Sequence, residues 1–87
     1  MAKHKEIGAV FVTRLNAELA KRGWTQKQFA ELLEISEPAI TRWLSGQHEP
    51  KAYSLARMAQ VLEVSADYLL GLTDYRYFRF RQIINSD

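Results

Sequence analysis

The segment Gly23–Gly46, GWTQKQFAELLEISEPAITRWLSG, contains two short helical patterns with almost nothing between them. The first pattern predicts a helix over about residues 26–33, and the second a helix over about residues 37–45. Only two residues separate the end of the first helix from Ser36, which precedes the second. A connection this short turns the chain sharply, so the two helices must cross at a large angle.

Three expected helix starts share one pattern, a hydroxyl side chain that caps the helix and a pair of apolar residues flanking it. The capping residues are Thr25, Ser36 and Ser65, and Gln28 completes a capping box with Thr25. Three further helices are expected from apolar residues at helical spacing, over about residues 6–22, 52–63 and 66–71. The sequence therefore predicts an all-α protein with five helices.

The start of the helix over residues 37–45 leaves two capping residues open. Ser36 is favoured by the apolar pair Ile35 and Ile40, which resembles a hydrophobic staple. Glu37 is favoured because it would put Pro38 at the first helical position, where proline is common. Proline also disfavours helical geometry at the residue before it. Either way the proline costs little, because an N–H in the first turn has no helical partner.

The composition limits the kinds of protein that this chain can be. Its 87 residues suit a single domain, and 47% hydrophobic residues are too many for a disordered chain. There is no cysteine and there are two histidines at no recognisable ligand spacing, so we expect no metal, no cofactor and no enzymatic activity. No apolar run is long enough for a signal peptide or a membrane span, which indicates a cytoplasmic protein without a membrane partner.

Charge is unevenly spread along the chain. The net charge is +2, yet residues 6–74 contain seven basic and nine acidic residues, and the surplus of basic residues lies at the two ends. A uniformly basic domain is typical of proteins that bind any polyanion. This chain must instead depend on where individual charges lie.

Three pieces of the sequence, GWTQKQFAELLEIS, AITRWLSGQHEP and LARMAQVLEVSADYLLGLTD, resemble the Xre-type helix-turn-helix family of phage repressors and Cro proteins. The resemblance runs from Arg14 to Asp74. It implies a lambda-repressor-like, five-helix DNA-binding domain over residues 1–74. It also implies a repressor-like, sequence-specific transcriptional regulator of bacterial or phage origin, which is associated with the nucleoid and binds double-stranded DNA as a homodimer. The helix over residues 37–45 would be the recognition helix in the major groove.

The sequence departs from the family pattern in several places. Glu34 occupies a turn position that favours glycine, where a left-handed backbone costs about 1 kcal/mol. Leu19 and Leu44 stand where the family often pairs an arginine with a glutamate, so no charge is left without a partner. Lys51 stands where a cap for the helix over residues 52–63 is expected, and lysine cannot accept a hydrogen bond there.

The resemblance implies two groups of DNA-binding residues. At the start of the helix over residues 26–33, Gln26 would bind a phosphate, with Lys27 and Gln28 as backbone contacts. On the recognition helix, Arg42 is the single basic residue and could bind guanine through two hydrogen bonds. Glu37 could accept from a cytosine amine, orient a basic neighbour or favour the helix dipole. The expected interface is Gln26, Lys27, Gln28, Ser36, Glu37, Pro38, Thr41, Arg42, Ser45 and Gln47.

The last residues, YRYFRFRQIINSD over 75–87, are too apolar for a tail that makes no contacts. We expect this C-terminal aromatic and basic extension to dock on the domain or to pair two subunits, with its arginines in solvent or near DNA. Its spacing fits a helix or an edge strand. The extension and the acidic middle also favour an alternative function, a protein-interaction module such as an antitoxin or a regulator that inhibits a protein partner.

Overall fold

The computed structural model describes the backbone of residues 3–77 and the side chains of residues 8–77. This part of the chain contains five helices and no strand, which confirms the all-α prediction. The first helix begins earlier than expected, and the last three end one or two residues sooner than predicted. The helices are α1 (Lys3–Arg22), α2 (Gln26–Leu33), α3 (Glu37–Leu44), α4 (Ala52–Leu62) and α5 (Ala66–Leu69).

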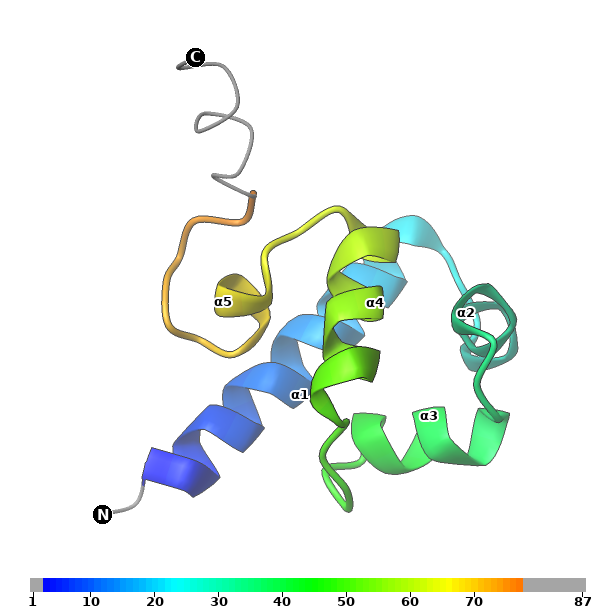
Figure 1. Cartoon of the computed structure of the whole chain (residues 1–87), viewed down its shortest axis with the longest axis horizontal. Helices are drawn as coiled ribbons and strands as arrows, with labels where there is room; N and C mark the ends of the chain where they lie inside the picture. Colours follow the sequence, from blue (N-terminus) through cyan, green and yellow to red (C-terminus); the bar gives the residue numbers. More distant parts are fainter. Residues whose placement is uncertain (1–2, 78–87) are drawn as a thin grey trace.

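The turn between α2 and α3 has the sharp geometry that its length requires. Figure 1 shows α2 nearly end-on and α3 lying across the view, so the two helices cross at a large angle. Glu34 adopts the left-handed conformation, with φ 59° and ψ 43°, and its N–H bonds back to the carbonyls of Ala30 and Glu31. A glutamate therefore fills the glycine position at the expected cost in backbone energy.

The core lies among the five helices, all of which contribute buried residues to it. Each helix contributes the apolar residues that its period placed on one face, and Val64 joins them from the connection between α4 and α5. Ala30 is 4% exposed, and its small side chain lies in the short helix α2, which packs against α3. The buried cluster consists of Phe11, Leu15, Leu19, Phe29, Ala30, Leu33, Ile40, Trp43, Met58, Leu62, Val64 and Leu69.

One carboxylate, Glu18 on α1, is buried within this apolar body with 1% of its surface exposed. Arg22 approaches it to 2.5 Å, and Arg76 donates two hydrogen bonds from Nη2, at 2.8 and 2.9 Å, and one from Nε at 3.2 Å. Burial by itself raises the pKa of Glu18, but the hydrogen bonds from Arg76 and Arg22 outweigh it. The pKa of Glu18 therefore lies below its ordinary value.

The prediction that the arginines of the C-terminal extension lie in solvent or near DNA is wrong for Arg76. Its side chain folds back onto α1, and its carbonyl oxygen accepts a 2.7 Å hydrogen bond from the N–H of Ser65, the cap of α5. Arg14 binds the preceding residues, at 2.8 Å to both the Thr73 carbonyl and Asp74. Residues 73–77 are thus attached to α1 and α5. Arg79, Arg81 and the proposed helix or strand lie outside the described residues.

Gly71, just after α5, packs closely against α1. Its φ is +81°, and a Cβ built there would lie 2.8 Å from Cγ1 of Val10. We expect Gly71→Ala to lower the free energy of unfolding by about 2 kcal/mol, of which roughly 1 comes from the left-handed backbone and roughly 1 from overpacking. Urea unfolding measures this change.

Gly23 is the matched control for that substitution. It has φ +68°, but nothing lies within 4 Å of a Cβ built on it. Gly23→Ala should therefore lose only the backbone contribution, about 1 kcal/mol. Equal losses at the two glycines would contradict a close contact between Gly71 and Val10.

Candidate nucleic-acid interface

The start of α2 has the capping box that the sequence predicts. The N–H of Gln28 donates to Oγ1 of Thr25 at 3.0 Å, and the N–H of Thr25 donates to Oε1 of Gln28 at 2.8 Å. Trp24 and Phe29 stack with ring centroids 6.3 Å apart, as expected for a staple. The capping box engages only the carbonyl oxygen of Gln28, so its amide nitrogen remains available as a donor.

The start of α3 resolves the choice between the two caps in favour of Ser36. Ser36 has an extended backbone, and its Oγ accepts from the N–H of Ala39 at 3.4 Å. Glu37 is the first helical residue and Pro38 the second, so Glu37 is not the cap. Its carboxylate lies in the first turn, where the helix dipole favours a negative charge.

The ten residues predicted from the sequence are all exposed. They lie on the adjoining helices α2 and α3, at the two caps of α3 (Ser36 and Ser45), and in the loop that follows it (Gln47). On α3, Ile40 and Trp43 are buried at 0% and 6% exposure, which leaves Thr41 and Arg42 on the outer face. Oγ of Ser45 donates to the carbonyl of Arg42 at 3.1 Å and helps to end the helix. The Arg42 guanidinium has no hydrogen-bond or ion-pair partner within residues 8–77, so it is free to bind a ligand.

A hydrogen bond between the two helices joins members of both predicted groups. Oγ1 of Thr41 donates to Oε1 of Gln26 at 2.6 Å, and it also lies 3.2 Å from the Glu37 carbonyl. The start of α2 therefore lies directly beside the outer face of α3. Sequence reasoning had assigned Thr41 and Gln26 to DNA separately and did not predict this bond.

A hollow beside α3 is lined in part by residues that the sequence analysis did not assign to the interface. It is lined by Arg42, His48, Lys51 and Ser54, among others, and so joins α3 to the start of α4. Lys51 occupies the N-cap position of α4, and its side chain makes no capping hydrogen bond, as predicted. The first N–H groups of α4 therefore lack a side-chain acceptor from the cap. Tyr53, in the same turn, is also exposed, at 77%, and was not among the residues predicted from the sequence.

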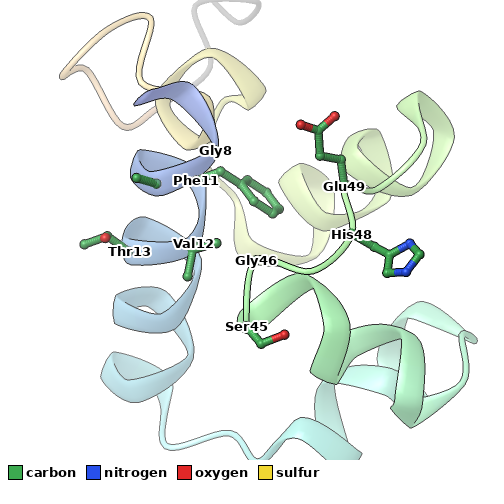
Figure 2. Close-up of a pocket in the computed structure, with 9 residues that line it drawn as sticks. Gly8, Phe11, Val12, Thr13, Ser45, Gly46, His48 and Glu49 are labelled. Atoms are coloured by element: carbon green, nitrogen blue, oxygen red, sulfur yellow. The ribbon is translucent and has the colours of Figure 1, made fainter. Parts of the chain in front are cut away.

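A second, larger groove lies behind the loop that follows α3. Figure 2 shows Phe11 pointing from α1 towards this loop, with Thr13 on the same helix and His48 and Glu49 on the loop. The volume of this groove is about 490 Å³. Gly46 lies at the turn of the loop, where a Cβ in its place would be 3.7 Å from Cγ2 of Val12. His48 and Glu49 line both hollows, so this loop is the wall between them.

The charges on the candidate interface are of mixed sign. The exposed cations are Lys27 at the start of α2, Arg42 on α3 and Lys51 at the start of α4. Two exposed acidic residues, Glu34 and Glu37, lie near them. The surface thus offers a few localised cations rather than a basic patch.

Within residues 8–77 no group of three or more histidine, cysteine, aspartate or glutamate side chains could hold a metal ion. Among the described helices, none is long and apolar enough to cross a membrane.

Comparison with known proteins identifies one family. A helix-turn-helix family model matches residues 15–69. The chain is 34% identical over 58 residues to the HTH-type transcriptional regulator ImmR of Bacillus subtilis (strain 168), covering 67% of this chain and 46% of the relative. It is 29% identical over 77 residues to the SPbeta prophage-derived uncharacterized HTH-type transcriptional regulator YonR of the same strain, covering 88% of this chain and 70% of the relative.

A third relative from that strain, the uncharacterized HTH-type transcriptional regulator YqaE, is 41% identical over 46 residues. That match covers 53% of this chain and 40% of YqaE. The chain thus matches less than half the length of ImmR and of YqaE. No solved structure gives a significant match.

Proposed function

Because the chain belongs to the helix-turn-helix family, which its match over residues 15–69 establishes, we propose that it is a sequence-specific, double-stranded DNA-binding transcriptional regulator. In this proposal α3 is the recognition helix and lies in the major groove. The regulator acts as a repressor by occupying its site. The names of the three relatives, all HTH-type transcriptional regulators, support the regulatory part of the proposal.

The observation that carries the proposal is the outer face of α3. Its inner residues Ile40 and Trp43 are fixed in the core, so the exposed Arg42 projects from a rigid helix. The Arg42 guanidinium, which has no partner within residues 8–77, can donate two parallel hydrogen bonds to O6 and N7 of guanine. The start of α2 lies beside this face and presents Gln26 and Lys27 for phosphate oxygens.

The acidic residues around this surface determine how it discriminates. Glu37 near a phosphate is repelled, which weakens binding to arbitrary DNA. At a matched site its carboxylate can accept a hydrogen bond from the N4 amine of cytosine. The proposed regulator therefore has low non-specific affinity and depends on base contacts, with Lys51, Tyr53 and the start of α4 adding backbone contacts.

A symmetric site follows if two copies bind together. In helix-turn-helix dimers the half-sites lie one helical turn apart, about 34 Å. We propose that this chain binds as a homodimer to such a site in the nucleoid, and that it needs no cofactor. The selected sequences themselves report this arrangement, because a dimer selects an inverted repeat.

Selection from random double-stranded oligonucleotides, followed by binding titrations at several salt concentrations, tests the proposed function. We expect an inverted repeat, and a binding constant that falls linearly on a log–log plot against salt with a slope of about −0.9 for each phosphate contacted. A scrambled sequence of equal length is the control. Selection that enriches no sequence would count against this function and in favour of a protein-interaction role.

A further inference from the structure

The two glutamines in the first turn of α2, Gln26 and Gln28, orient their side-chain amides in the same way. The carbonyl oxygen of Gln28 accepts from the N–H of Thr25, and the carbonyl oxygen of Gln26 accepts from the hydroxyl of Thr41. Neither amide nitrogen has an acceptor among the residues that the structure describes. Both side chains therefore use their acceptor atom inside the protein and keep their donor groups for a ligand.

The two oxygens are fixed in different ways. Gln28 is fixed within its own helix by the capping box, so its orientation follows from local sequence. Gln26 is fixed from α3, fifteen residues further along the chain, through the 2.6 Å bond from Thr41. The same hydroxyl also lies 3.2 Å from the Glu37 carbonyl, and the shorter contact, to Gln26, is the better hydrogen bond.

We propose that Thr41 is a positioning residue for Gln26, which it turns so that the amide NH₂ faces a DNA phosphate. This inference rests on the proposed function. Without the hydroxyl, the Gln26 amide could rotate and present its oxygen, which a phosphate repels. With it, the amides of Gln26 and Gln28 and the ammonium of Lys27 form a surface of donors only, which suits an anion.

The same bond connects the phosphate contact to base reading. Gln26 begins α2, whereas Thr41 is adjacent to Arg42 on the recognition helix. A bond between them fixes the start of α2 relative to the face that enters the groove. Thr41 thus acts through Gln26 on binding to every DNA sequence, and not as a reader of one base.

A double-mutant cycle tests the coupling. Thr41→Val keeps the shape and removes the hydroxyl, and we expect its dissociation constants for both the selected site and scrambled DNA to rise roughly 2- to 10-fold, as for one lost hydrogen bond. Gln26→Ala should weaken binding to both DNAs alike. In the Gln26→Ala background, Thr41→Val should cost nothing further. Thr41→Ser, which keeps the hydroxyl, should restore binding.

Nuclear magnetic resonance of the free protein tests the hydrogen bond without DNA. Thr41→Val should shift the side-chain amide resonances of Gln26 and lower the order of that group, while the Gln28 amide, which is bonded to Thr25, stays unchanged as an internal control. An unchanged Gln26 amide would overturn the inference. So would equal losses from Thr41→Val with and without Gln26, or a change of preference at a single base.

The outcomes separate this inference from the proposed function. If the wild-type chain selects no DNA sequence, the proposed function fails and the inference fails with it. If the wild-type chain binds a selected site and Gln26→Ala weakens it, but Thr41→Val is additive with Gln26→Ala, the proposed function stands and only the role of Thr41 is overturned.

Discussion

Replacing Arg76 by alanine is expected to lower the free energy of unfolding by about 3 kcal/mol, the lower end of the range for breaking a buried ion pair. Glu18 is 1% exposed, and Arg76 supplies three of its hydrogen bonds. Arg22 remains as a partner, which limits the loss. For a domain of this size the melting temperature should fall by roughly 12–24 °C. Thermal and urea unfolding measure the effect.

The pH dependence of stability checks the cause of that loss. The folded pKa of Glu18 is depressed, so its contribution is present above the unfolded value of about 4.3 and is lost as pH falls through the folded pKa. Without Arg76 less opposes the effect of burial, so acid unfolding of the variant should begin at higher pH than in the wild type.

A second substitution distinguishes a stranded charge from lost packing. Glu18→Gln in the Arg76→Ala background removes the buried charge, so the two substitutions together should cost less than the sum of the single ones. Additive losses would mean that Arg76 contributes through packing, for example through its contacts with the rings of Tyr68 and Tyr77, rather than through the carboxylate.

Replacing Arg42 by alanine is expected to reduce the preference for the selected site over scrambled DNA by about 1–3 kcal/mol, roughly 5- to 150-fold. Arg42 is exposed on α3 and has no ion-pair partner within residues 8–77, so the change removes the proposed base contact and leaves the core intact. Repeating the oligonucleotide selection with the variant should show lost preference for guanine at one position in each half-site.

Two control substitutions separate base reading from general attraction to phosphate. Arg42→Lys keeps the charge but lacks the planar pair of donors, so it should lose most of the guanine preference. Lys27→Ala should weaken selected and scrambled DNA alike and reduce the salt slope by about 1. If Arg42→Ala behaved as Lys27→Ala is expected to, Arg42 would be a phosphate contact and the proposed base reading would be wrong.

Local sequence was sufficient for most of the fold. Thr25 and Ser65 are the caps that the sequence indicated, and Ser36 is one of the two that it left open for α3. Each of the three accepts a hydrogen bond from the N–H three residues further on. The boundaries were less certain because a helix end depends on one or two residues. Glu63, for example, adopts the left-handed conformation (φ 58°) and ends α4 one residue before the predicted end.

The arrangement of the candidate interface could be predicted in part. Periodicity separates the buried Ile40 and Trp43 from the exposed Arg42, because a helix turns its successive residues by a fixed angle. It could not show that Gln26 and Thr41 are bonded, since the angle between α2 and α3 decides that distance. It also could not show that Arg42 shares a hollow with Lys51 and Ser54 on α4.

The sequence by itself determined five helices, the caps Thr25 and Ser65, the sharp turn at Glu34 and the outer face of α3, because each depends on interactions within about four residues along the chain. Only the tertiary structure decided which polar groups far apart in sequence meet. Arg76 lies 58 residues from Glu18, and nothing in its own neighbourhood distinguishes it from a solvated arginine. The pairing follows from the path of residues 73–77 over α5 and α1, which brings a guanidinium to a buried carboxylate.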